Sequence, residues 1–140
     1  MSAQEKIEIK CPECGDKTKI TVWQSINVSI DTEMKEELMH GHINVFHCPN
    51  CGYQDPLPMP FLYHDMDRGF CVQYYPVNEL DDDSFFANFT PTGKIALDPK
   101  EFPDELIPDY MKDTHIVFSM MELVQYVFFR DKLDAFFVQA

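Results

Sequence analysis

The feature that most constrains this chain is a pair of nearly identical cysteine motifs, KCPECG at residues 10–15 and HCPNCG at residues 47–52. Each motif places two cysteines three positions apart around a proline and ends with a glycine. Proline fixes φ, and glycine accepts the positive φ that lets backbone amides turn toward the sulfurs. The resulting spacing, C-x2-C-x33-C-x2-C, is typical of a metal site.

The four cysteines predict one structural Zn²⁺ ion, with the ligands Cys11, Cys14, Cys48 and Cys51. Zinc favours a tetrahedron of four ligands, with sulfur at about 2.3 Å, and each C-x-x-C turn supplies one edge of it. Four protein ligands leave no open coordination position, so we expect the ion to hold the fold and not to catalyse a reaction. The alternative is a redox dithiol, which needs one C-x-x-C at the start of a helix, whereas each pair here precedes an apparent strand.

Two further residues have side chains that can bind a metal, but we do not expect them to be ligands. Cys71 lies within the apolar alternation FCVQYY and is expected to be a small buried hydrophobic residue. His47 adjoins Cys48 and is expected to point the other way.

The charge of the chain argues against non-specific binding to nucleic acid. There are 24 acidic residues against 11 lysines and arginines, a formal net charge of −13, and four thiolates around a zinc ion add about two more negative charges. The segment 79–113 alone carries ten acids and three lysines. We therefore expect nucleic acid to be an unlikely partner, and we interpret the acidic segment as a solvated face.

The sequence contains neither a long apolar run nor a secretory signal. No stretch of about 18 apolar residues occurs, and the N-terminus MSAQEKIEIK has mixed charge. We expect a cytoplasmic protein with no membrane contact. In that reducing compartment, closely spaced cysteines favour metal binding over disulfides.

The order of predicted elements favours a single α+β domain over residues 1–140. Alternating apolar and β-branched residues predict strands at 4–10, 18–30 and 42–46. Asp31 or Thr32 as N-cap and Gly41 beyond the end predict a short helix between the last two strands. The domain is divided into the knuckles with their intervening segment (8–53), a hairpin (61–75), an acidic proline-rich insert (76–113), and a strand with a helix (114–138).

The C-terminal segment is the strongest helix prediction. Ser119 and Glu122 form a capping box, and apolar residues follow at helical spacing: Met120, Leu123, Val124, Val127 and Phe128. After the polar RDK, residues 133–137 form a second short apolar set. We expect a mostly antiparallel sheet with a zinc-ribbon-like pair of knuckles and this helix packed on it. Aromatic residues of the insert, among them Phe85, Phe86 and Phe102, are expected to be buried.

Several further motifs resemble those of the bacterial and archaeal CpXC domain. They are W-x-S-I-N (residues 23–27), ELMHGHIN (37–44), LYHD (62–65), the closing YYP (74–76) and IVFSMMELV (116–124), together with both CPxCG turns. The resemblance covers roughly residues 8 to 130. This family has no established biochemical function, so the resemblance implies the four cysteine ligands and leaves the activity open.

The sequence leaves three candidate functions. Tyr126 and Phe129 lie outside the main apolar face of the C-terminal helix. This favours a zinc-stabilised module that binds another protein, or a second copy of the chain, through its aromatic-rich C-terminal surface. The alternative is a helix that is buried on both sides. A hydrolase-type enzyme could use His64 and Asp65, but adjacent strand residues point to opposite faces, and Asp65 is expected to cap the following turn. A nucleic-acid-binding zinc ribbon could use the lysines near the first knuckle: Lys6, Lys10, Lys17 and Lys19.

Overall fold

The computed structural model describes residues 2–96 and 107–139. Its main element is a five-stranded mixed sheet with the order β1-β2-β5-β6-β7. Neighbouring strands β2–β5 and β6–β7 are parallel, and β1–β2 and β5–β6 are antiparallel. The predicted α+β class is confirmed. The strands are β1 (Ala3–Lys10), β2 (Lys17–Asn27), β5 (Phe61–Asp65), β6 (Phe70–Tyr74) and β7 (His115–Val117).

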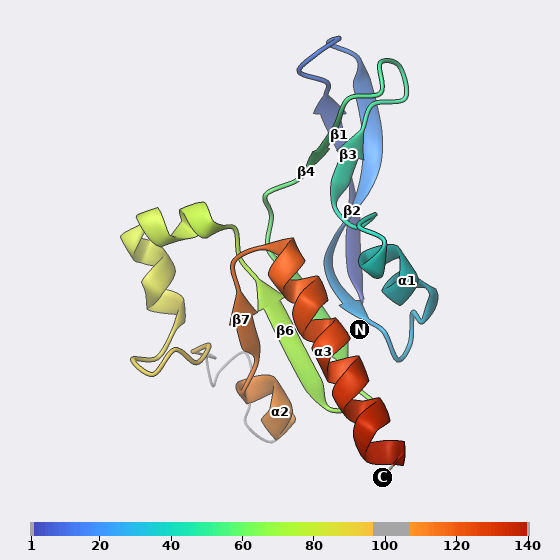
Figure 1. Ribbon diagram of the computed structural model, residues 1–140. Coiled ribbons are helices and arrows are strands. Elements are labelled where there is room, and N and C mark those ends of the chain that lie inside the picture. The colour runs from blue at the N-terminus through green and yellow to red at the C-terminus, as the bar shows by residue number, and fades with distance from the viewer. Residues whose placement is uncertain (1, 97–106, 140) are drawn as a thin grey trace.

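A second, two-stranded sheet and the β1–β2 hairpin together form a zinc-ribbon-like lobe. The two-stranded sheet pairs β3 (Val45–His47) antiparallel with β4 (Gln54–Pro56) and lies beside the long β1–β2 hairpin (Figure 1). Only residues 25–27 of β2 pair with β5, so most of the β1–β2 hairpin extends beyond the other strands of the main sheet. Each of the two hairpins carries one cysteine motif in its turn.

The two predicted helices begin directly after their predicted N-cap residues. α1 (Glu33–Met39) follows Thr32, whose side chain makes no capping hydrogen bond, and is followed by Gly41 at φ 76°. α3 (Met120–Gln139) follows Ser119, whose Oγ accepts a 3.0 Å hydrogen bond from the Glu122 amide. The acidic insert contains the short 3₁₀ helices η1 (Val77–Asp81) and η2 (Asp83–Asn88) and, near its end, the short helix α2 (Asp109–Lys112). Among the described residues, no helix combines the length and apolar character needed to cross a membrane.

The main hydrophobic core lies between α3 and one face of the sheet. Leu123 and Val127 of α3 are fully buried in it together with Phe61, Tyr63 and Val72. A much smaller core in the zinc-ribbon-like lobe consists of Cys11, Phe46 and Cys48, with Ile9, Ile20, Tyr53 and Leu57 around it. The two cores lie at different positions along β2, which runs from one to the other.

Three local predictions are wrong. The strand expected at 42–46 begins only at Val45, because Asn44 adopts φ 55° and its side-chain amide exchanges two 2.8 Å hydrogen bonds with the backbone of Trp23. The strand expected at 18–30 ends at Asn27, and residues 28–30 form a turn. Phe85 is buried as expected, but Phe86 is 51% exposed, and Phe102 lies outside the described residues.

Candidate metal centre

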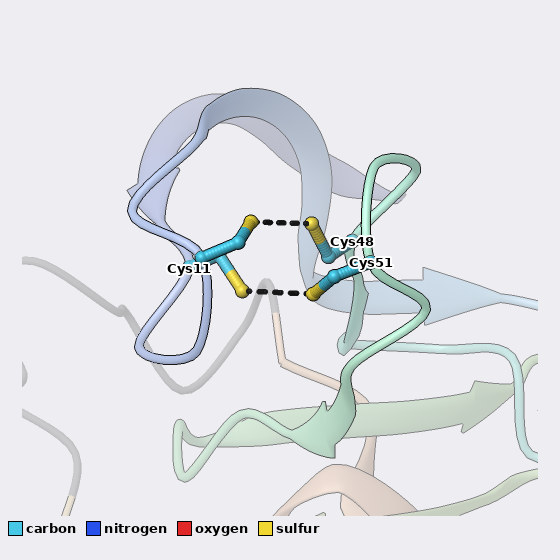
Figure 2. A group of neighbouring side chains, drawn as sticks. Cys11, Cys48 and Cys51 are labelled. Carbon is cyan, nitrogen blue, oxygen red and sulfur yellow. Dashed lines mark hydrogen bonds between the residues drawn. The ribbon is translucent and has the colours of Figure 1, made fainter.

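The fold brings the four motif cysteines together at the tips of the two hairpins (Figure 2). The Sγ atoms of Cys11 and Cys51 are 3.6 Å apart, as are those of Cys14 and Cys48. All four sulfurs lie within 4.8 Å of one another. Each close pair joins one motif to the other, and the paired cysteines are 34 and 40 positions apart in the sequence.

The two motifs adopt the same backbone conformation. The Cys11 amide donates to the carbonyl of Asp16 and the Cys48 amide to that of Tyr53, five residues on in both cases. The glycine amides also match, because Gly15 donates to the Cys11 carbonyl and Gly52 to the Cys48 carbonyl, at 2.9 and 3.0 Å. Both glycines have positive φ, 78° and 81°, as the sequence predicts. The centre is therefore built from two equivalent knuckles.

The spacing of the sulfurs fits a tetrahedral metal ion. With metal–sulfur bonds of about 2.3 Å, the edges of a regular tetrahedron are about 3.8 Å. The two 3.6 Å sulfur–sulfur distances lie close to that value. The other sulfur pairs are at most 4.8 Å apart, so they would approach each other by at most about 1 Å to form the tetrahedron. Four thiolates would complete a tetrahedron without a position for water or substrate, which is the arrangement of a structural site.

One cysteine of each motif faces the protein and the other faces solvent. Cys11 and Cys48 are buried against Phe46, whereas Cys14 and Cys51 are exposed. A hydrogen bond from Asn50 Nδ2, at 3.5 Å, is the main cause that lowers the pKa of the Cys14 thiol to about 7. The backbone hydrogen bond of Tyr53 lowers the pKa of the Cys51 thiol, but desolvation and the neighbouring sulfurs raise it more, to about 12. The cluster thus holds protons that a metal ion would displace.

His47 and Cys71 lie outside the cysteine cluster, as the sequence predicts. His47 is exposed whereas the adjacent Cys48 is buried, so the two side chains face different surroundings. Cys71 is buried in β6, and burial is the main cause that raises its pKa to about 11. Each C-x-x-C turn is followed by a strand, β2 or β4, and not by the helix that a redox dithiol would require.

His64 and Asp65 do not form a dyad. His64 Nε2 lies 2.6 Å from Tyr110 Oη, and burial lowers the pKa of its imidazole. Asp65 accepts a 3.0 Å hydrogen bond from the Arg68 amide, which confirms the predicted cap of the turn, and a second from Arg68 Nε at 2.9 Å. Both side chains are buried, and each is held by a different partner.

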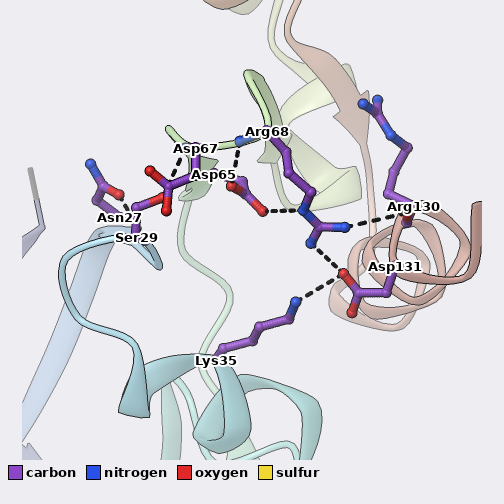
Figure 3. A network of polar contacts seen from close by, with 8 residues as sticks. All are labelled: Asn27, Ser29, Lys35, Asp65, Asp67, Arg68, Arg130 and Asp131. Carbon is purple, nitrogen blue, oxygen red and sulfur yellow. Dashed lines mark hydrogen bonds and ion pairs between the residues drawn. The ribbon is translucent and has the colours of Figure 1, made fainter. Parts of the chain in front are cut away.

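Sequence reasoning missed the polar network around Arg68 (Figure 3). The Arg68 guanidinium joins Asp65, in its own turn, to Asp131 of α3, and Lys35 of α1 donates to the same Asp131 carboxylate at 2.8 Å. The network thus connects three elements that are far apart in sequence. Its only early signal was the charged RDK triplet, which interrupts the apolar pattern of the C-terminal helix.

The fold and the cysteine cluster define a class: an α+β protein in which two knuckle-bearing hairpins form a four-cysteine, zinc-ribbon-like centre. A family model for the CpXC protein family matches residues 9–139, and the chain belongs to that family. Comparison with curated proteins and with solved structures found no significant match.

Proposed function

We propose that this protein is a zinc-stabilised, non-catalytic module that binds a protein partner through the C-terminal half of α3. Two arguments support the zinc: the near-tetrahedral set of four sulfurs and the two matched knuckles. A closed four-thiolate centre offers no site for substrate, so the ion would serve the fold. The binding activity then has to come from the surface of the module.

The observation that carries the proposal is the exposed apolar surface of α3. Four of its phenylalanines are more than half exposed, at 53%, 53%, 66% and 67% for Phe128, Phe129, Phe136 and Phe137. Val138 is 77% exposed. Monomeric soluble proteins rarely leave several large apolar side chains exposed together, and aromatic residues are enriched at protein interfaces.

Affinity capture with a matched pair of variants tests this proposal. The immobilised wild-type chain is expected to retain a protein partner, which is either another copy or a different protein. The variant Phe129→Ser/Phe136→Ser should lose that partner, whereas Phe86→Ser, which removes an equally exposed phenylalanine from η2, should keep it. Retention of the same partner by both variants would contradict the proposed surface.

A second candidate function rests on the exposed face of the β1–β2 hairpin. The antiparallel register places Lys10 opposite Lys17 and Glu8 opposite Lys19, with Lys6 two residues further along the same face. The four lysines are exposed, and none forms an ion pair with a residue that the structure describes. Like charges directly opposite each other destabilise a strand pair, so this arrangement favours an anionic partner such as a phosphate backbone.

Nucleic-acid binding would show a characteristic dependence on salt. Single-stranded DNA bound by three or four lysines should give a slope of log K against log salt of about −2 to −3, and Lys10→Glu/Lys17→Glu should abolish binding. No measurable binding at low salt would remove this candidate and leave the protein-interaction proposal unaffected.

A further inference from the structure

The exposed apolar residues of α3 form a stripe that is separate from its buried face. The buried face contains Leu123 and Val127, which pack on the sheet. The stripe consists of Phe129, Leu133, Phe136 and Phe137, at positions i, i+4, i+7 and i+8. At 100° per residue these four positions lie within about one third of the helix circumference, centred about 110° from Leu123 and Val127. We call them the phenylalanine stripe.

The phenylalanine stripe lies where α3 extends beyond the body of the molecule. In Figure 1 the C-terminal end of α3 projects past the end of β6. Next to the stripe is a hollow of about 420 Å³ between α3 and the β5–β6 turn, lined by Leu133 and Phe137 and by four charged residues: Asp67, Arg68, Arg130 and Asp134. The stripe therefore presents protruding rings beside a partly charged depression.

We propose that the partner on this surface is a second copy of the chain, with the two α3 helices packed antiparallel about a two-fold axis. This inference rests on the proposed function, because it names the partner of the same surface. A two-fold interface uses the same patch on both copies, so rings of one copy can pack against the stripe of the other and the reverse. The crossing helices would cover both stripes.

The exposed area of the stripe is about half of what a standard interface needs. A large aromatic side chain offers roughly 150–250 Å², so the exposed fractions of its three phenylalanines correspond to roughly 370 Å². Leu133 raises this to roughly 430 Å² per copy, against about 800 Å² per partner in a standard interface. The remainder has to come from the residues that flank the stripe, among them the half-exposed Phe128.

Charge also favours self-association at this helix over the rest of the surface. The whole chain carries −13, whereas α3 holds two basic and three acidic residues, a net charge of −1. Two copies therefore repel least where their α3 helices meet. Arg130 and Asp134, one turn apart beside the hollow, form no ion pair with any residue that the structure describes. Antiparallel packing brings the arginine of each copy toward the aspartate of the other.

Analytical ultracentrifugation of the full chain over a range of concentrations tests the dimer. The expected species has twice the 16.4 kDa mass of one chain. Added salt should strengthen the dimer, because it screens the repulsion between two acidic chains and leaves the apolar contact intact. Phe129→Ser/Phe136→Ser should weaken it at least about tenfold, whereas Phe86→Ser should leave it unchanged. Melting temperature and metal content establish that each variant is folded.

A charge exchange tests the antiparallel arrangement. Arg130→Glu and Asp134→Arg should each weaken the dimer, and the double variant should recover most of the loss, because it restores opposite charges across the axis. A wild-type chain that stays monomeric at high micromolar concentration overturns the inference, as does a dimer that the serine variants do not weaken. If the monomer still captures a different protein through the stripe, the proposed function stands without the dimer; if it captures none, both fall.

Discussion

Gly15 and Gly52 show how single residues shape the metal centre. Each has positive φ at the end of its knuckle, and each donates its amide back to the carbonyl of the first cysteine. Both features follow from the CPxCG pattern, which is local and repeated, so the two knuckles and the grouping of their four cysteines could be predicted from the sequence. The burial of Cys11 and Cys48 beside Phe46 could not, because it depends on the packing of two distant hairpins.

Replacing one ligand should remove metal and stability together. Cys48→Ser leaves three thiolates and a buried hydroxyl, so metal content and melting temperature are expected to fall in parallel, by elemental analysis and calorimetry. Cys71→Ala is the matched control, because Cys71 is equally buried but lies outside the cluster. This control should keep its metal with only a modest loss of stability. A Cys48→Ser chain with full metal content would show that the four cysteines are not the ligands.

Replacing one knuckle glycine separates backbone strain from ligand loss. An added Cβ at Gly52 meets no atom within 4 Å, so Gly52→Ala acts only through its φ of 81° and should cost about 1–2 kcal/mol of stability. Gly93 offers the same open surroundings at φ 87°, away from the cysteines. Gly93→Ala should cost a similar amount without changing zinc affinity, whereas Gly52→Ala should weaken zinc binding in a chelator competition. Equal affinity in both variants would argue against a role of the knuckle conformation in metal binding.

At the scale of elements, α3 depends on contacts that no local pattern contains. Its start could be predicted from Ser119, because a capping residue acts within one turn. The predicted segment also extends to residue 138, although the charged triplet at 130–132 interrupts the apolar pattern. In the structure Asp131 is held by Lys35 of α1 and by Arg68 of the β5–β6 turn, and Arg130 lies 4.2 Å from the ring centroid of Phe70. Strand β3 shows the same limit, because Asn44 shortens it through contacts with Trp23.

Neutralising Asp131 should loosen α3 from α1 and from the β5–β6 turn. Partial burial raises the pKa of Asp131, but hydrogen bonds from Lys35 and Arg68 lower it more, so the pKa lies below its usual value. Asp131→Asn is therefore expected to lose about 1–3 kcal/mol at neutral pH. Asp134→Asn on the same helix, at a carboxylate without an ion pair among the described residues, should lose almost nothing when both variants are compared as monomers at low concentration.

The effect of Asp131 should also depend on pH in a defined direction. A carboxyl group with a lowered folded-state pKa stabilises the fold above its unfolded pKa of about 3.9, and this contribution is lost as the pH falls through the folded-state value. The stability difference between wild type and Asp131→Asn should be constant near neutral pH and shrink below about pH 4. Urea unfolding at a series of pH values measures it. A difference that does not change in acid would mean that the charge of Asp131 is not what stabilises the contact.

At the scale of the whole molecule, the residues that the structure describes form two cores of very different size. Twelve buried residues form the core under α3, whereas three form the core of the zinc-ribbon-like lobe, and two of those three are cysteines of the cluster. Such a small apolar cluster stabilises a lobe only weakly without a cross-link or a metal. The lobe is thus expected to depend on its metal, and the α3 core is expected to be largely independent of it.

Removing the metal should therefore unfold one part of the molecule and spare the other. After chelation, amide hydrogen exchange is expected to accelerate in the knuckles and in β3 and β4, where the Cys11 and Cys48 amides are now hydrogen bonded. Amides of β6 and of the first half of α3 should stay protected, because Leu123, Val127 and Val72 remain packed. Added zinc should restore protection in wild type but not in Cys48→Ser. Uniform loss of protection throughout the chain would instead make the metal a support of both cores, and unchanged exchange in the knuckles would uncouple it from folding altogether.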